Sequence, residues 1–226
     1  MNRIWRLSVG PIGVNCYIVC SDSQVCIVDP GYGAQTIADR LETLNLSPTL
    51  IVLTHGHLDH SAAIPDLFML TGKELPIAIH ADDACYLGPE GEETNRRLFD
   101  AIRASGFFRS MWKPLPPPAI LLCDGDVLPG TSIQVIHTPG HSRGSICLYV
   151  ADLEEGMLPG NARTCLLTGD TLFRDGVGRT DTPDADHMQL EASLKKLAHF
   201  PPETPVFPGH GPETVIGREL HAPMRR

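Results

Sequence analysis

Long hydrophobic runs, paired cysteines and clusters of basic residues are all missing from this chain of 226 residues. Its apolar runs, such as 16–20 and 49–54, are far shorter than the roughly 20 residues that a membrane-spanning helix requires. Residues 1–10 also lack the apolar core and small-residue cleavage site of a signal peptide. We therefore expect no membrane association and a cytoplasmic location.

The charge balance is acidic, with 18 basic and 27 acidic residues and a net charge of −9. Such a chain is not expected to bind nucleic acid or anionic membrane, so the expected partner is a small molecule. The chain has seven cysteines, an odd number, and no C-x-x-C pair. Several lie within apolar runs, where a free thiol behaves as a small hydrophobic group. We predict no disulfide framework, in keeping with a reducing compartment.

Strand-like and helix-like segments alternate along the chain. The patterns predict strands at 3–9, 15–20, 24–28, 49–54, 76–80, 132–137, 145–150, 164–168 and 205–207, and helices at 34–45, 61–70, 92–105 and 186–198. The proline-rich stretch 113–118 fits neither element, so we assign 88–118 as an insertion that crosses between two halves of one domain, 1–226. Short strands mixed with helices in both halves predict helices packed outside two facing sheets.

Four of the predicted strands end in the same way, with a turn that presents a side chain able to bind a metal. These side chains are His55, His141, Asp170 and His210, and glycine directly precedes the last three. Glycine permits unusual backbone angles and close approach of the main chain to an ion. Because loops at strand ends commonly display functional side chains, we predict that the four strand ends converge on one site.

The segment 55–60 reads H-G-H-L-D-H and is the richest in donor atoms. His55 and His57, two residues apart on a loop, can face one ion, whereas Asp59 and His60, at the start of a helix, can face a second. Imidazole nitrogen with carboxylate oxygen suits zinc, manganese or ferrous iron. An adventitious histidine cluster is the alternative, but it would have to account for all four strand ends together.

These motifs resemble those of the metallo-β-lactamase superfamily. They are T-H-G-H-L-D-H at 54–60, T-P-G-H at 138–141, T-G-D at 168–170 and P-G-H-G at 208–211, in the family's order over about residues 3–219. The resemblance implies an α/β fold, the four-layer αββα sandwich. It also implies two zinc ions, with iron or manganese as substitutes: one held by His55, His57 and His141, the other by Asp59, His60 and His210, with Asp170 bridging both.

The implied chemistry is hydrolysis. Two cations that share a hydroxide lower the pKa of the parent water to about 7, and the hydroxide then attacks an electrophilic carbonyl. Asp59 would be the catalytic residue that takes a proton as the intermediate collapses.

Position 170 narrows the choice of substrate. True lactamases carry cysteine or serine there, so Asp170 disfavours antibiotic hydrolysis. The segment 169–173, G-D-T-L-F, is similar to that of glyoxalase II and its short bacterial relatives, which predicts hydrolysis of thioesters such as S-lactoylglutathione. Full-length glyoxalase II continues with a lysine and aromatic residues that bind glutathione. Here Arg179, Thr180 and Asp181 stand instead, and we expect no C-terminal glutathione-binding domain.

Other activities stay open. The segment 178–181, G-R-T-D, is similar to that of persulfide dioxygenases of the same fold, which would use one iron held by His55 or His57, His141 and Asp170. A lactonase and a non-catalytic metal-binding protein are further alternatives. The acidic charge argues against a tRNA nuclease.

Three residues outside the ligand set are candidates for supporting roles. Asp29 and His80 follow apolar strands and are expected to support ligand histidines, and Arg179 is expected to bind a substrate carboxylate. The alternatives are a turn residue at 29, an ordinary histidine at 80 and an internal salt bridge from Arg179 to Asp181 or Asp175.

The predicted insertion carries four aromatic residues, Phe99, Phe107, Phe108 and Trp112. We expect them to close a local core. If they face the site instead, they would form an apolar wall over the substrate.

Overall fold

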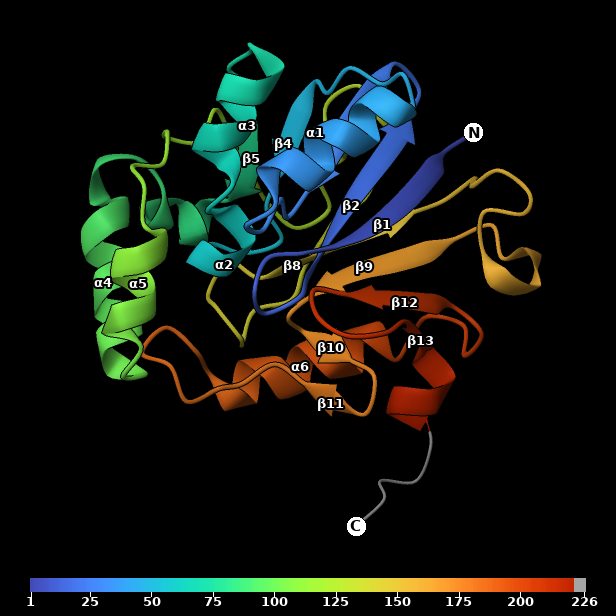
Figure 1. Ribbon diagram of the computed structural model, residues 1–226. Helices are drawn as coiled ribbons and strands as arrows, with labels where there is room; N and C mark the ends of the chain where they lie inside the picture. Colours follow the sequence, from blue (N-terminus) through green and yellow to red (C-terminus); the bar gives the residue numbers. More distant parts are fainter. Residues whose placement is uncertain (222–226) are drawn as a thin grey trace.

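Two β-sheets face each other in the computed structural model, which describes residues 1–221 (Figure 1). The six-stranded sheet runs in the order β1 (Arg3–Val9), β2 (Val14–Ser21), β3 (Gln24–Val28), β4 (Leu50–Val52), β5 (Ile77–His80) and β6 (Ile120–Leu122). The five-stranded sheet runs in the order β13 (Thr214–Val215), β12 (Pro205–Pro208), β9 (Cys165–Gly169), β8 (Ile146–Val150) and β7 (Gln134–His137). A small separate hairpin joins β10 (Leu172–Phe173) to β11 (Gly176–Val177).

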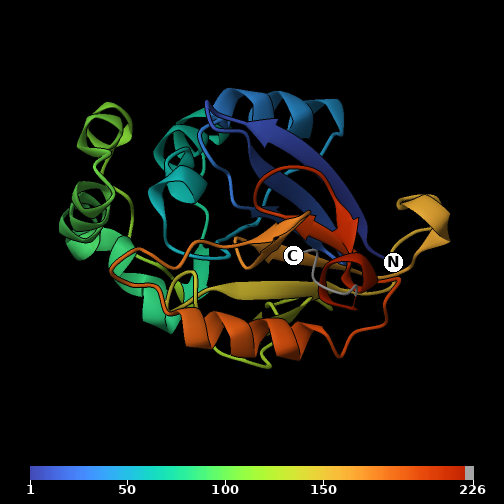
Figure 2. The same ribbon diagram turned by 90° about the horizontal axis from the view of Figure 1, so that it is seen from below.

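Helices cover the outer faces of both sheets (Figures 1 and 2). They are α1 (Ala34–Thr43), α2 (Leu58–Ser61), α3 (Ile64–Thr71), α4 (Gly91–Ala101), α5 (Ser105–Met111) and α6 (His187–Leu197), with short turns η1 (Ala81–Tyr86), η2 (Gly88–Glu90), η3 (Pro159–Asn161) and η4 (Gly217–His221). The helices α1 and α3 lie on one outer side, α6 on the other, and α4 and α5 stand at one end of the sandwich. Within residues 1–221, no helix has the length and apolarity needed to cross a membrane.

The alternation of side chains along buried strands explains the layers. Every residue of β2 is buried. Cys16 and Ile18 point into the core beneath α1 and α3, whereas Tyr17 and Val19 point into the core between the sheets. In β8, Cys147 points towards α6 and the residues on either side of it point between the sheets. Since strand side chains alternate between faces, each sheet buries both faces, and the predicted αββα sandwich is confirmed.

The insertion differs from its prediction in two ways. It leads from β5 to β6 of the same sheet and does not cross between the two halves. The predicted helix 92–105 is also wrong in extent, because the chain leaves the helix after Ala101 and Arg103 adopts a left-handed conformation with φ of 59°. The segment therefore forms a hairpin of two helices. The last five residues of the predicted domain, 222–226, lie outside the described residues.

The two sheets bring their strand ends together at one edge. In the five-stranded sheet, β9 and β12 are parallel, and β7 and β9 both run antiparallel to β8, so these three strands end at the same edge. The amide of Ile146 donates a hydrogen bond of 2.8 Å to the carbonyl of Thr54, just past β4, and thereby ties the sheets together there. The turns that follow β4, β7, β9 and β12 carry the predicted metal ligands.

The turn before His141 requires glycine at position 140. Gly140 has φ of +139°, and a Cβ there would lie 2.3 Å from the backbone nitrogen of Leu190 in α6. Its carbonyl also accepts a hydrogen bond from the amide of Asp186, directly before α6. A side chain at this position would therefore push α6 away from the loop that holds His141.

We predict that Gly140→Ala lowers the free energy of unfolding by about 2–4 kcal/mol, through backbone strain and steric overlap together. Gly125→Ala is the matched control, because Gly125 also has a positive φ but faces open space, and it should cost only about 1 kcal/mol. Urea unfolding in the presence of a chelator measures both without a contribution from metal binding. Equal losses in the two variants would contradict the close packing of Gly140.

Candidate metal centre

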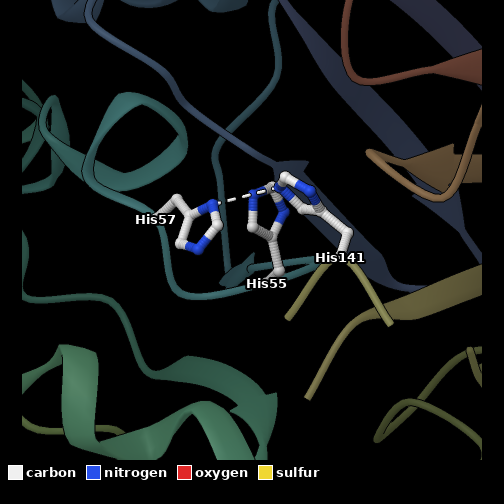
Figure 3. Close-up of side chains that lie close together, drawn as sticks. All are labelled: His55, His57 and His141. Carbon is white, nitrogen blue, oxygen red and sulfur yellow. Dashed lines mark hydrogen bonds between the residues drawn. The ribbon is translucent and has the colours of Figure 1, made fainter. Parts of the chain in front are cut away.

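Three imidazole rings meet at the edge where the sheets converge (Figure 3). His55 and His57 come from the loop after β4, and His141 from the turn after β7. Ring centroids lie 4.6 Å apart for His55 and His57 and 4.7 Å apart for His57 and His141. The Nδ1 atom of His57 lies 3.1 Å from the Nε2 atom of His141. All three rings are buried, and one donor atom from each fits around a single ion.

A second group of donors lies beside the first. It consists of Asp59 and His60, both in α2, and His210, which follows β12. The Asp59 Oδ2 atom lies 3.4 Å from His210 Nε2 and 3.7 Å from His60 Nε2. This mixed nitrogen and oxygen set can hold another ion.

The carboxylate of Asp170 lies between the two groups. Its Oδ1 atom is 3.4 Å from His60 Nε2, and its Oδ2 atom is 3.7 Å from both His141 Nε2 and His210 Nε2. His55, His60 and Asp170 form a further set of donors within 4.8 Å of one another. One carboxylate thus contacts histidines from both groups, as a bridging ligand must.

Several of these metal-binding atoms lack a hydrogen-bond partner, as expected if they bind cations. His55 Nε2, His60 Nε2 and Asp170 Oδ1 are buried and have no hydrogen-bond partner. Buried polar atoms are nearly always paired, so three unpaired ones in a single cluster need a reason. A divalent metal would satisfy all three, with the loss of a proton from His60 Nε2.

The electrostatics differ between the histidines, with the pKa lowered for His55 and His141 and raised for His57, His60 and His210. Burial, with the neighbouring His60 and His57, holds the pKa of His55 well below its usual range, and burial lowers the pKa of His141 to about 4. Both rings are therefore neutral at pH 7, the form that binds metals. Burial alone would lower the pKa of His60, but the carboxylates of Asp170 and Asp59 outweigh it and raise the pKa to about 10. A divalent cation would neutralise the same carboxylates.

Asp29 supports the second group from behind. Its Oδ2 atom lies 3.0 Å from His60 Nδ1 and accepts a hydrogen bond of 2.6 Å from the Thr54 hydroxyl, while Oδ1 accepts one of 2.8 Å from the Thr54 amide. Asp29 is 1% exposed and adopts a left-handed conformation with φ of 49°. The hydrogen bond that His60 Nδ1–H donates to Asp29 turns the Nε2 atom of His60 towards Asp59 and Asp170 and fixes the ring.

Asp184 and Tyr86 support His57 in a comparable way, and the sequence analysis missed both. The Asp184 Oδ2 atom lies 3.1 Å from His57 Nε2 and accepts a hydrogen bond of 2.6 Å from the Tyr86 hydroxyl. The Tyr86 ring also packs edge-on against the His57 ring at 5.5 Å. Asp184 lies in T-P-D-A-D, just before a helix, where Asp186 caps α6. In the sequence this segment looks like a helix cap at Asp186, and nothing in it marks Asp184 for a second role.

Asp83 is a third missed residue and joins the two loops of the first group. Its carboxylate accepts hydrogen bonds from the amide of Gly56 at 2.9 Å, the amide of Gly144 at 2.6 Å and the hydroxyl of Ser142 at 2.7 Å. It is 1% exposed. Two adjacent aspartates follow β5, and only the fold shows that Asp83 is the buried one.

The structure does not bring His80 to the centre. Its ring stacks on His137 with centroids 3.9 Å apart, and its Nδ1 atom accepts a hydrogen bond from the amide of Asp82. Among the described residues, no ligand histidine shares a hydrogen bond with it. The reason is that His80, the last residue of β5, caps η1 through its Nδ1 atom and stacks on His137.

Arg179 is engaged within the chain. Its Nε and Nη2 atoms donate hydrogen bonds of 2.7 and 2.9 Å to the two oxygens of Asp181, which is one of the salt bridges anticipated from the sequence. Its carbonyl oxygen lies 3.1 Å from His141 Nδ1. The backbone of Arg179 thus orients His141, and the residue also lines the cavity described next.

A cavity of about 350 Å³ opens onto the centre. His57, Asp59, His141 and Asp170 line one side of it, and apolar residues of the helical hairpin line the other, Phe99 and Phe107 among them. The other two aromatic residues, Phe108 and Trp112, pack against each other at 5.4 Å in the core. Phe99 and Phe107 thus form part of an apolar wall over the site, whereas Phe108 and Trp112 close a local core.

A four-layer sandwich with a histidine and aspartate centre at its edge defines a metal-dependent hydrolase. The family model described as the metallo-beta-lactamase superfamily matches residues 9–210, and the chain belongs to this superfamily.

Relatives with functional names include two bacterial proteins. The "Probable metallo-hydrolase YqgX" of Bacillus subtilis is 32% identical over 214 residues, covering 93% of this chain and 91% of the relative. The "Hydroxyacylglutathione hydrolase GloC" of Haemophilus influenzae is 30% identical over 209 residues, covering 91% of this chain and 89% of the relative.

Two solved structures are similar over nearly their whole length, each with a TM-score of 0.74. TTHA1623, crystallised in a di-iron-bound form, is 33% identical, with 95% of this chain and 96% of that chain covered. The B3 metallo-beta-lactamase BLEG-1 is 30% identical, with 96% of both chains covered.

We predict that Asp184→Asn weakens binding of the metal at His55, His57 and His141 by about 10- to 100-fold, because an amide carries no charge to strengthen His57 as a ligand. Tyr86→Phe should have a smaller effect in the same direction. Tyr32→Phe, at an exposed tyrosine in the turn before α1, is the control. Competition with a chromophoric chelator measures the affinities, and parent-like values for Asp184→Asn would refute the support assigned to Asp184.

Proposed function

We propose that this metal-dependent hydrolase is a thioester hydrolase of glyoxalase II type that works with two zinc ions, for which iron or manganese can substitute. The observation that carries the proposal is the Asp170 carboxylate between two groups of histidines at the floor of a mostly apolar cavity. The hydroxyacylglutathione hydrolase among the relatives supports the choice of substrate. The di-iron form of TTHA1623 supports iron as a substitute for zinc.

The metals and the protein contribute different parts of the chemistry. Bound divalent ions supply Lewis acidity and lower the pKa of water. Asp170 keeps the two groups of donors together, Asp29 and Asp184 fix the orientation of His60 and His57, and the apolar wall excludes bulk water from the reacting carbonyl. In such surroundings fixed charges act strongly on developing charge.

Asp59 has the position and ionisation state to handle a proton. Its carboxylate lines the cavity. Burial would raise its pKa, but the charge of His60 and the hydrogen bond from His210 outweigh burial and hold the pKa well below its usual range. Asp59 is therefore ionised at neutral pH. Its low pKa makes it a weak base, so it would hold the proton of the intermediate only briefly as the carbon–sulfur bond breaks. A thiol has a pKa near 8.5 and leaves as the thiolate without a strong acid beside it, which suits a thioester.

Release of free thiol from S-lactoylglutathione tests the proposal directly. We expect turnover by the zinc-loaded protein and a loss of at least about 100-fold in Asp170→Asn, because a neutral amide holds two cations poorly. Asp39→Asn, at an exposed carboxylate of α1, is the matched control and should keep parent activity. Turnover by Asp170→Asn within tenfold of the parent, at full metal loading, would contradict the bridging role.

Two competing reactions belong in the same assay series. Hydrolysis of a β-lactam tests the activity named for BLEG-1, and oxygen uptake with glutathione persulfide tests the dioxygenase alternative. We expect both to be far slower than thioester hydrolysis. A protein that oxidises the persulfide with one iron per chain, and hydrolyses no thioester, would overturn the proposed function.

A further inference from the structure

Apolar side chains form the wall of the cavity over the metal centre. Leu98 and Phe99 come from α4, Ile102 follows it, and Phe107 comes from α5. Ile12, in the turn between β1 and β2, adds another apolar side chain. Leu98 and Phe99 are buried and Phe99 stacks on Phe107 at 5.8 Å, so the wall is a packed surface continuous with the core beneath it.

Polar groups are scarce away from the metal donors. Of the remaining residues that line the cavity, only Arg179 and Thr182 are polar. The Arg179 guanidinium is already paired with both oxygens of Asp181, so much of its charge is neutralised. Leu98, Phe99, Ile102 and Phe107 offer no side-chain donor or acceptor to a hydroxyl group of the kind that a lactoyl group carries.

The metal donors form the floor of the cavity and the helical hairpin forms its wall, and this arrangement determines which part of a substrate contacts the wall. A carbonyl carbon held at Asp59 and Asp170 has two substituents, the acyl chain and the sulfur. A thiol carrier such as glutathione is charged, and burial of its charges against apolar side chains would be costly, so the carrier extends from the cavity towards solvent. The acyl chain is then left to the apolar wall of the helical hairpin.

Building on the proposed function, we infer that the preferred substrates are thioesters of medium-length or aromatic apolar acyl groups, and that Ile102 and Phe107 select them. The cavity volume of about 350 Å³ lies near the lower end of small-molecule sites, which favours a medium chain over a long one. Burial of each methylene against the wall is worth a factor of roughly four in kcat/KM.

A series of straight-chain acyl thioesters of one thiol, from acetyl to hexanoyl, tests the inference. We expect kcat/KM to rise roughly fourfold for each methylene and the hexanoyl ester to exceed the lactoyl ester. Ile102→Asn should reduce the hexanoyl-to-acetyl ratio at least tenfold, whereas Ile102→Leu, which keeps an apolar side chain of equal size, should retain it. Met188→Asn, at a residue of α6 that is 80% exposed, should change neither rate.

Alkyl hydroxamates separate failure of this inference from failure of the proposed function. Binding of acetohydroxamate and hexanohydroxamate to the metal-loaded protein, measured by calorimetry, requires no turnover. Tighter binding of the longer compound, lost in Ile102→Asn, supports the apolar acyl pocket even if no thioester is hydrolysed. Equal binding of the two compounds, or rates that follow the thiol and ignore the acyl chain, would overturn it.

Discussion

The carboxylate of Asp170 must reach histidines from both sheets, and the surrounding backbone is arranged around that requirement. A Cβ on Gly209 would lie 2.3 Å from Asp170 Oδ1 and 2.8 Å from the His60 ring, so the turn after β12 passes this close only because residue 209 is glycine. The amide of Gly209 also donates a hydrogen bond of 2.7 Å to the carbonyl of Gly169. The parallel pairing of β9 and β12 thus continues into the centre.

Three carboxylates surround the metal-binding side chains and hold them in place. Asp29, Asp83 and Asp184 stand behind the ligand loops, and the first two are almost completely buried. Buried carboxylates are costly unless they are paired or hydrogen-bonded. Each of these carboxylates has hydrogen-bond partners. Asp29 and Asp184 pair with ligand histidines, and Asp83 accepts hydrogen bonds from backbone amides of both loops. The pairing reduces the cost of burial and holds the donors in place for a cation.

The sequence predicted the layers and the donor set from local signals. Short strands mixed with helices in both halves predict the two facing sheets, and a metal-competent side chain directly after a strand marks the positions of His55 and Asp170. The sequence predicted a supporting role for Asp29 but not for Asp83 or Asp184, because these two are brought to the centre by loops distant in the chain. His80 ends the parallel strand next to the one that leads to His55, but its ring stacks on His137. The break at Arg103, which creates the helical hairpin, has no proline or glycine to signal it.

The central claim is that two metal ions share the Asp170 carboxylate. X-ray absorption spectroscopy of the protein loaded with zinc or iron tests this claim most directly, since it detects a neighbouring metal. We expect two equivalents per chain and a metal–metal separation of about 3.5–4 Å. A single equivalent with no metal–metal scattering at saturating metal would contradict the account.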